Sequence, residues 1–406
     1  MSESVMSNET PSFLKFKGLS LLGALGAGVF WLWLLVGSGE THGFALNSFV
    51  YGYAFWFLLT LGCLALSILH NSIKSSWTLA VLRIFEAGSS WQMFLILAIF
   101  FLPVAKNLPI VYEWARPEFH AHKVDEALAF KHVWLQPSGF YIRGIIYLVI
   151  LGFISATLRR STNRHDKNQD PQEFQFRTNF ASPMLVVFAI VITFLLTDLT
   201  MSLTPHWYST IYPLWLVLGG CQAALSLGTY LVCSNATKDP YKGSMSPALT
   251  KDLGNMMFVL TMLWGYTSVS QLIILWNGNL PETASFYAHR GGDAKFGWNF
   301  IGASTILGCF VIPFVTLLAP RVKRYPERLK NIAAFIFAFR IVDVFWIIGA
   351  AIQFRQVKVA LPVIWDVAGF VLMGFVWFAV MLWRVEKAPL LPLYDNRLKE
   401  AKANAH

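Results

Sequence analysis

Residues 181–213 read ASPMLVVFAIVITFLLTDLTMSLTPHWYSTIYP, and this stretch decides the fold class. It begins with an apolar run of about twenty residues, long enough to cross a hydrocarbon core as a helix. Asp198 stands inside the end of that run, where a carboxylate is costly. The chain then leaves the run through Pro205 and His206, and a second apolar run follows. The stretch therefore predicts two membrane helices joined by a short turn.

The composition of the whole chain extends this prediction. Of the 406 residues, 56% are hydrophobic and 13% are charged, and the mean hydropathy is +0.53. A soluble domain carries about 25% charged residues. The net charge of +10 is explained by basic residues that flank membrane spans, and no nucleic-acid-binding pattern accompanies it. The composition excludes a soluble protein and predicts a polytopic, all-α membrane protein.

Ten apolar runs predict ten transmembrane helices, since only helices satisfy the backbone of a single span in lipid. The predicted spans are 17–37, 46–69, 77–104, 137–158, 181–203, 209–233, 254–277, 296–319, 331–353 and 361–384. Lys and Arg number 21 in the two tails and alternate connections, but only 8 in the other connections. Because basic residues concentrate on the cytoplasmic side, both termini are predicted to be cytoplasmic.

The spans divide the chain into regions. The tails are 1–16 and 385–406, spans one to four occupy 17–158, and spans five to ten occupy 181–384. Between the two groups, the polar residues 159–180 predict a cytoplasmic linker. The first group includes a long external loop, 105–136, with a short helix expected around Glu118–Phe130.

Six ionisable residues inside the spans are candidates for a proton path: Arg83, Glu86, Asp198, Arg340, Asp343 and Asp366. Arg83 with Glu86, and Arg340 with Asp343, are spaced i, i+3 and so share one helix face. Each pair fits a salt bridge that fixes helix packing. Each also fits a relay in which the arginine tunes its carboxylate. The acids occupy several depths, which favours a relay, but both interpretations stay open.

The residue types that hold metals or redox centres are not arranged for that purpose. All nine histidines fall at span ends, in loops or in tails, so none is placed to bind haem between helices. The four cysteines are scattered through apolar runs without iron–sulfur or zinc spacing. We therefore expect this chain to bind no metal or redox cofactor itself, with a quinol or quinone as the one candidate ligand.

The run Asp198-Leu-Thr-Met-Ser-Leu-Thr-Pro-His-Trp-Tyr-Ser-Thr-Ile resembles the motif of the NrfD-like membrane subunits of alternative complex III. That complex is a bacterial quinol:cytochrome c oxidoreductase, and these subunits are related to the polysulfide reductase membrane subunit. The ten spans, the cytoplasmic termini and the long external loop also agree, and the smaller, ActF-type subunit has about this length. The resemblance implies two four-helix bundles plus extra helices in the bacterial cytoplasmic (inner) membrane.

The same resemblance implies a role in respiratory or photosynthetic electron transport. The implied partners are a sister NrfD-like membrane subunit, multihaem and monohaem cytochrome c subunits and an iron–sulfur subunit, with a terminal oxidase as a further candidate. Lipid is a further expected partner, and nucleic acid is not expected. The implied contribution of this chain is proton translocation through half-channels, for which Glu86, Asp198, Arg340 and Asp343 are its candidates.

Three functions remain open. The first is a cofactor-free, proton-conducting and structural subunit of that complex. The second is a quinol-binding subunit, in which Asp198 accepts a hydroxyl proton, His206 holds the other ring oxygen, and Trp207 or Tyr208 packs on the ring. The near-neutral pKa of histidine suits that task, although His206 also fits a helix cap. The third is a proton-coupled secondary transporter, but spans broken by Gly or Pro do not recur in matching positions of two halves.

Overall fold

The computed structural model describes residues 10–73, 77–117, 131, 133–242, 245–292, 297–352 and 363–392. Within these ranges all regular structure is helical, and ten segments are long and apolar enough to cross a membrane. They overlap the ten predicted spans one for one, which confirms the polytopic all-α fold. The short helix expected at Glu118–Phe130 lies outside the described residues.

Spans two to five form a first bundle. Its helices are α3 (Glu40–Ile73), the broken span α4 (Leu82–Gly88), α5 (Trp91–Phe100) and α6 (Leu102–Lys106), and the pair α10 (Pro137–Asn168) and α11 (Pro171–Leu199). α3 packs on α4 and α11, and α10 packs on α5 and α11. The break between α4 and α5 lies at Ser89 and Ser90, so Glu86 stands just before it.

Spans six to nine form a second bundle. Its helices are α12 (Tyr212–Cys233), α13 (Pro247–Gly278), α15 (Trp298–Ile306) with α16 (Ile312–Leu318), and α18 (Pro326–Val344). The described residues of this half include three π-helical turns: η4 (Ala288–Gly292), η5 (Leu307–Val311) and η6 (Phe345–Gly349). The short helices α14 (Pro281–Tyr287) and α17 (Pro320–Lys323) join its spans. π-helical turns often mark functional positions.

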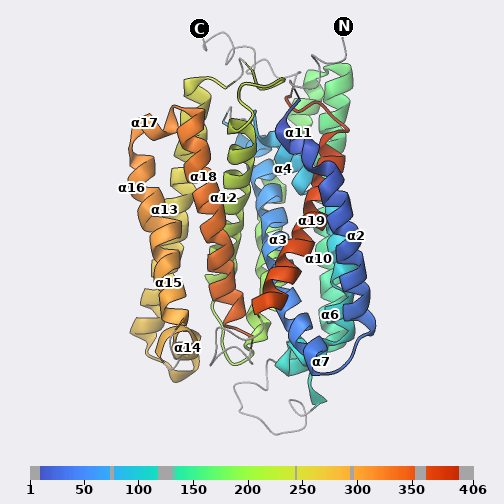
Figure 1. Ribbon diagram of the computed structural model, residues 1–406, viewed down its shortest axis with the longest axis vertical. Coiled ribbons are helices and arrows are strands. Elements are labelled where there is room, and N and C mark those ends of the chain that lie inside the picture. Colours follow the sequence, from blue (N-terminus) through green and yellow to red (C-terminus); the bar gives the residue numbers. More distant parts are fainter. Residues whose placement is uncertain are drawn as a thin grey trace.

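The first and last spans, α2 (Lys17–Val36) and α19 (Val363–Val385), stand outside both bundles. α19 packs on α3, α2 and α4, so it covers the first bundle (Figure 1). An ion pair between Lys17 and Glu386 brings the start of α2 and the end of α19 together. We call this side of the molecule the termini end. That end is predicted to face the cytoplasm.

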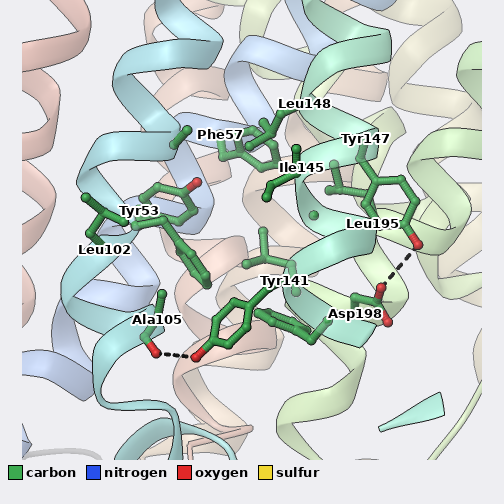
Figure 2. A pocket seen from close by; sticks show the side chains of 15 residues that line it. Tyr53, Phe57, Leu102, Ala105, Tyr141, Ile145, Tyr147, Leu148, Leu195 and Asp198 are labelled. Atoms are coloured by element: carbon green, nitrogen blue, oxygen red, sulfur yellow. Dashed lines mark hydrogen bonds between the residues drawn. The ribbon is translucent and has the colours of Figure 1, made fainter. Parts of the chain in front are cut away.

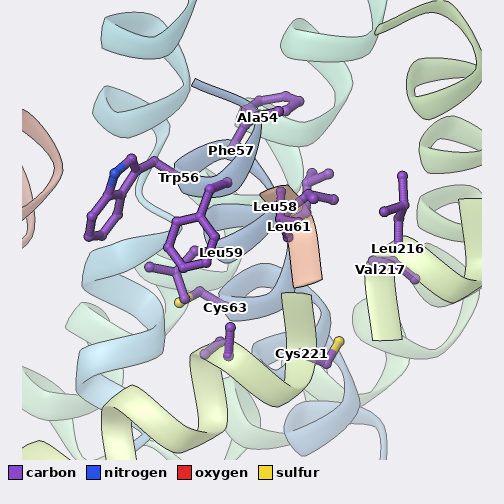
Figure 3. Packing of buried hydrophobic residues seen from close by; sticks show 14 of the residues in the cluster. Ala54, Trp56, Phe57, Leu58, Leu59, Leu61, Cys63, Leu216, Val217 and Cys221 are labelled. Carbon is purple, nitrogen blue, oxygen red and sulfur yellow. The ribbon is translucent and has the colours of Figure 1, made fainter. Parts of the chain in front are cut away.

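The two bundles meet where α3 crosses α12, and glycine makes the crossing close. A Cβ atom on Gly62 would stand 2.1 Å from the carbonyl oxygen of Gly220, and one on Gly220 would stand 2.4 Å from that of Leu58. Apolar side chains of both helices surround this point, among them Leu61 and Cys221 (Figure 3). Small residues let membrane helices approach closely and pack well.

Residues 159–180 differ from the predicted polar linker. α10 continues to Asn168 and α11 begins at Pro171, so only Gln169 and Asp170 connect the two helices. Gln169 has a left-handed backbone with φ of 54°, and the Asp170 carboxylate accepts the N–H of Gln172. Capping and polar side-chain pairing let both helices continue beyond their apolar spans. The polarity of this stretch does not mark a loop.

Candidate functional site

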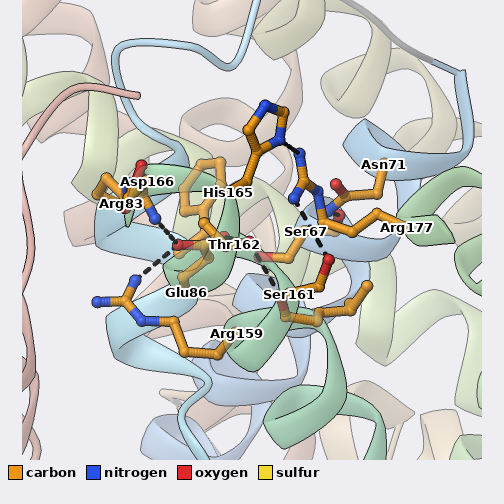
Figure 4. A network of polar contacts seen from close by, with 12 residues as sticks. Ser67, Asn71, Arg83, Glu86, Arg159, Ser161, Thr162, His165, Asp166 and Arg177 are labelled. Carbon is orange, nitrogen blue, oxygen red and sulfur yellow. Dashed lines mark hydrogen bonds and ion pairs between the residues drawn. The ribbon is translucent and has the colours of Figure 1, made fainter. Parts of the chain in front are cut away.

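Glu86 lies at the centre of a buried charge network in the first bundle (Figure 4). It accepts hydrogen bonds from Arg83 Nη1 at 2.9 Å, Arg159 Nη1 at 2.6 Å and the Thr162 hydroxyl at 2.9 Å. Arg83 Nη2 also donates to Asp166, 2.6 Å from Oδ2. The predicted pair of Arg83 with Glu86 therefore forms, but within a neutral group of two cations and two anions. This network ties α4 to α10.

A very small cavity adjoins Glu86. Its volume is about 10 Å³, and Ser67, Ser89 and Ser155 contribute hydroxyl groups to its lining. The buried hydroxyl of Ser67 has no hydrogen-bond partner within the described part of the chain. A cavity of this size holds about one water molecule.

Asp198, at the end of α11, is buried and bound on both of its oxygens. Arg143 Nε donates to Oδ2 at 2.8 Å and Trp134 Nε1 donates to Oδ1 at 2.6 Å. The Tyr147 hydroxyl also donates to Oδ2 at 3.1 Å. The Arg143 guanidinium stacks 4.1 Å from the Trp134 ring centroid. Asp198 therefore fastens the end of α11 to the start of α10.

Beside Asp198 lies a cavity of about 270 Å³ between α3, α5, α10 and α11 (Figure 2). We call it the Asp198 cavity. Aromatic rings and aliphatic side chains form its wall, and Asp198 and Tyr147 add polar groups on one side; besides Tyr147, the rings belong to Tyr53, Phe57, Phe101, Phe140 and Tyr141. An apolar, aromatic cleft with a few polar groups is the usual form of a small-molecule site.

The residues that follow Asp198 do not join it in this cavity. His206 is exposed, and Tyr208 is 55% exposed. Trp207 is buried, but its ring stacks on Phe286 of α14 with centroids 4.5 Å apart. The lining of the Asp198 cavity includes none of these three residues. The sequence-based hypothesis has Asp198 and His206 bind the same quinol ring. In the structure, His206 does not line the cavity beside Asp198.

Asp343, in α18, is bound on one side only. Its Oδ2 pairs with Arg340, as predicted, whereas its buried Oδ1 has no hydrogen-bond partner among the described residues. Arg340 Nη1 donates to Gln222 at 3.0 Å, and Gln222 Nε2 donates to the Thr261 hydroxyl at 2.9 Å. This polar chain crosses the second bundle from α18 through α12 to α13.

A larger cavity, of about 450 Å³, adjoins Asp343. We call it the Asp343 cavity. α12, α13, α15 and α18 line it, and its wall includes the indole rings of Trp215, Trp264 and Trp346. The Arg340 guanidinium lies 4.5 Å from the Trp264 ring centroid, next to this wall. The second bundle therefore contains a cavity with both aromatic and charged groups beside it.

Arg290, in η4, lines the Asp343 cavity and was not a sequence candidate. It is buried and donates to the carbonyl oxygens of Phe286 at 2.7 Å and Trp346 at 3.2 Å, and also to that of Ile347. Burial lowers the pKa of the guanidinium to about 10, so it stays charged at neutral pH. Arg290 therefore fastens α14 and η4 to η6.

The candidate acids occupy two levels rather than a continuous ladder. At about 1.5 Å per residue, Glu86 lies roughly 6 Å from the start of α4, towards the termini end. Asp343 lies roughly 9 Å before the end of η6, and Asp198 lies one residue before the end of α11, both towards the opposite end. Asp366 is buried in the first turn of α19 and lines neither large cavity.

Three of the arginines at these sites were missed by sequence reasoning: Arg143, Arg159 and Arg290. A buried carboxylate needs a cation or water nearby, but sequence spacing does not show which residue supplies it across helices. Arg159 and Asp166 fell in the predicted linker, and the helical continuation of α10 brings them to Glu86.

No protein-family model matches this sequence, and a search of curated proteins finds no match. Within the described ranges, no group of three or more His, Cys, Asp or Glu side chains is placed to hold a metal ion. Fold and composition identify a polytopic helical membrane protein.

Proposed function

We propose that this chain is an NrfD-like membrane subunit of a quinol:electron-acceptor oxidoreductase of the alternative complex III type, in the bacterial cytoplasmic membrane. It has no redox centre of its own and provides part of a proton path. The motif from Asp198 to Ile211 and the layout of ten spans support this assignment. The partners are those that the resemblance implies: a sister membrane subunit, cytochromes c and an iron–sulfur subunit.

The unequal binding of the buried carboxylates supports the proton path. Glu86 and Asp198 use both of their oxygens in hydrogen bonds to cations, hydroxyls or an indole. Asp343 lines a cavity and leaves one buried oxygen without a partner in the part of the chain that the structure describes. A carboxylate that exchanges protons needs an oxygen open to a donor. We therefore assign proton exchange to Asp343, and helix fastening to Glu86 and Asp198.

The first test is purification of the affinity-tagged chain from its native membranes. Multihaem and monohaem cytochromes, identified by haem staining and mass spectrometry, are expected to co-purify in fixed ratio. Purification of the chain without any cytochrome would contradict membership of such a complex.

The second test measures proton translocation by the purified complex in vesicles. Asp343→Asn removes the exchangeable proton with little change in size, so we expect fewer protons moved per electron while quinol oxidation continues. Asp252→Asn is the matched control, because Asp252 is an exposed acid on α13. An unchanged proton-to-electron ratio in Asp343→Asn would rule out the proposed proton path.

A second candidate function, quinol binding by this chain, is favoured by the Asp198 cavity. Its aromatic wall fits a planar ring, and Asp198 and Tyr147 offer polar groups at one side. Gly144 lines the cavity, and a Cβ atom there would have no neighbour within 4 Å.

Gly144→Leu therefore fills the Asp198 cavity without a backbone clash and is expected to abolish binding of a quinol analogue. Gly28→Leu is the control, because Gly28 on α2 is equally unhindered and lines neither cavity. Equal binding by both variants would exclude a quinol from this cavity.

A further inference from the structure

We propose that the Asp343 cavity binds a membrane-soluble molecule that carries a hydroxyl group on an apolar body. Such a molecule is either an aliphatic lipid alcohol or a phenol. This inference goes beyond the proposed proton path and does not depend on it. It is carried by buried polar groups that lack partners, by the depth and opening of the cavity, and by the local helix geometry.

The residues around the cavity carry both an acceptor and donors that lack partners in the described ranges. Oδ1 of Asp343 is a buried acceptor without a partner, and Nε1 of Trp215, Trp264 and Trp346 are buried donors without partners in the described ranges. All four residues line the cavity. A buried polar atom without a hydrogen bond is costly. A hydroxyl group donates one hydrogen bond and accepts two, so it can satisfy both kinds of atom.

Charge balance disfavours a cationic ligand. Asp343 is already paired with Arg340, so its free oxygen calls for a hydrogen-bond donor rather than another cation. The other cation at the wall, Arg290, is engaged with three backbone carbonyl oxygens. A cationic ligand would therefore remain unpaired in this cavity, and burial of an unpaired charge is strongly unfavourable.

The inner part of the cavity lies too deep for the charged headgroup of a phospholipid. Trp264 and Leu272 stand fourteen and six residues before the end of α13 at Gly278, or roughly 21 and 9 Å along the helix. The cavity therefore extends into the hydrocarbon region, where a phosphate lacks water. A hydroxyl group on an apolar body can enter that region.

The cavity opens to the lipid side of the second bundle. Among its lining residues, Val269 is 54% exposed, Leu272 39% and Ile306 58%, and these lie on α13 and α15. In a membrane helix bundle such side chains contact lipid. The ligand can therefore enter sideways from the bilayer. At about 450 Å³, the cavity is large enough for a ring or a branched apolar body.

Three π-helical turns meet at this cavity. Arg290 of η4, Phe310 of η5 and Trp346 of η6 all line it. π-helical turns are rare and are found disproportionately at functional sites, because they cost helix stability. Their convergence is independent of the unpaired polar groups and points to the same place.

The test uses the purified full-length chain in lipid nanodiscs and four photoreactive probes. Two are a long-chain alcohol and an alkylphenol, each with a diazirine, and two are their methyl ethers. Mass spectrometry locates the labelled peptides. The alcohol, the phenol or both are expected to label α13, α15 or η6 saturably, and the relative labelling identifies the source of the hydroxyl. The ethers cannot donate a hydrogen bond to Asp343. We therefore expect half-saturation of labelling to need at least about tenfold higher concentrations of the ethers than of the alcohols.

Two variants separate the cavity from the general lipid surface. Ala303 lines the cavity, so Ala303→Phe is expected to abolish saturable labelling. Ala189→Phe, on the exposed face of α11, is expected to leave it unchanged. Competition by excess non-photoreactive alcohol in the unaltered protein gives a result that does not depend on the folding of a variant.

Equal labelling by alcohols and ethers, labelling that Ala303→Phe does not reduce, or no saturable labelling in the cavity would each overturn the proposal. The last result would mean that the polar groups bind only water. None of these outcomes bears on the proton-to-electron ratio of Asp343→Asn, so failure of this inference and failure of the proposed proton path remain distinguishable.

Discussion

At the scale of single residues, the three central carboxylates differ in how completely they are bound. Glu86 and Asp198 are each held by at least three donors, and they fasten helices to one another. Asp343 keeps one oxygen unbound within the described part of the chain. Fully bound carboxylates stabilise a fold, whereas a half-bound one beside a cavity can interact with a proton or a ligand.

Glu86→Gln tests the fastening role. The substitution leaves Arg83 and Arg159 buried without their shared anion, so we expect a loss of about 3–5 kcal/mol in the free energy of unfolding. Unfolding in detergent–lipid micelles measures it. Glu386→Gln removes the half-exposed partner of Lys17 and is expected to change stability by less than about 1 kcal/mol. Equal effects of the two substitutions would contradict a structural role for Glu86.

Arg290→Met tests the fastening of η6. Three backbone carbonyl oxygens lose their donor, and each buried acceptor left unsatisfied costs about 1–3 kcal/mol. We expect faster amide hydrogen exchange in η6 and α14, measured by mass spectrometry. Arg328→Met is the control, because Arg328 is exposed and should leave exchange unchanged. Unaltered exchange in Arg290→Met would show that another contact holds η6.

At the scale of helices, the apolar runs predicted where the spans lie, but not where the helices end. A membrane span is recognised by its hydropathy, whereas a helix ends where its backbone groups find caps or other partners. α10 and α11 thus continue well past their apolar residues, because Asp170 caps α11 and polar side chains such as Arg177 and His165 pair with one another. Polarity alone therefore predicts a linker at residues 159–180, where the structure has two helices.

Gly62→Ala tests the close crossing of α3 and α12. The added methyl group would meet the carbonyl oxygen of Gly220, and overpacking of this kind typically costs about 1–3 kcal/mol. The expected result is a lower midpoint of thermal unfolding. Gly28→Ala, which meets no atom within 4 Å, should leave the midpoint unchanged or raise it, since alanine favours the helix. Equal midpoints of thermal unfolding for both variants would contradict the close contact between the backbones of α3 and α12.

At the scale of the whole molecule, the fold could be predicted from the sequence, but the sites could be predicted only in part. Hydropathy alone predicts the ten spans, and the i, i+3 spacing of Arg340 and Asp343 predicts that these two side chains pair. The partners of Glu86 and Asp198 come from other helices, such as Arg159 and Arg143, and the two cavities depend on side chains from four or more segments. Such contacts depend on helix packing, which no local pattern encodes.

Orientation in the membrane is the remaining property of the whole molecule that the sequence predicts. The excess of Lys and Arg in the tails and alternate connections predicts that the termini end faces the cytoplasm. Arg324 is exposed near the start of α18, at the termini end, and Tyr208 is exposed at the opposite end. A cysteine introduced at either position is expected to be the only one that reacts with a thiol reagent, because the four native cysteines are buried.

The experiment treats intact cells with a membrane-impermeant maleimide. Tyr208→Cys is expected to be labelled from outside, whereas Arg324→Cys is expected to react only after the membrane is opened. The unaltered chain controls for the buried native cysteines and should remain unlabelled. The reverse pattern would place the termini outside. It would also put Asp198 and both large cavities closer to the cytoplasm, so that the proposed proton exchange at Asp343 would connect to the inner rather than the outer side.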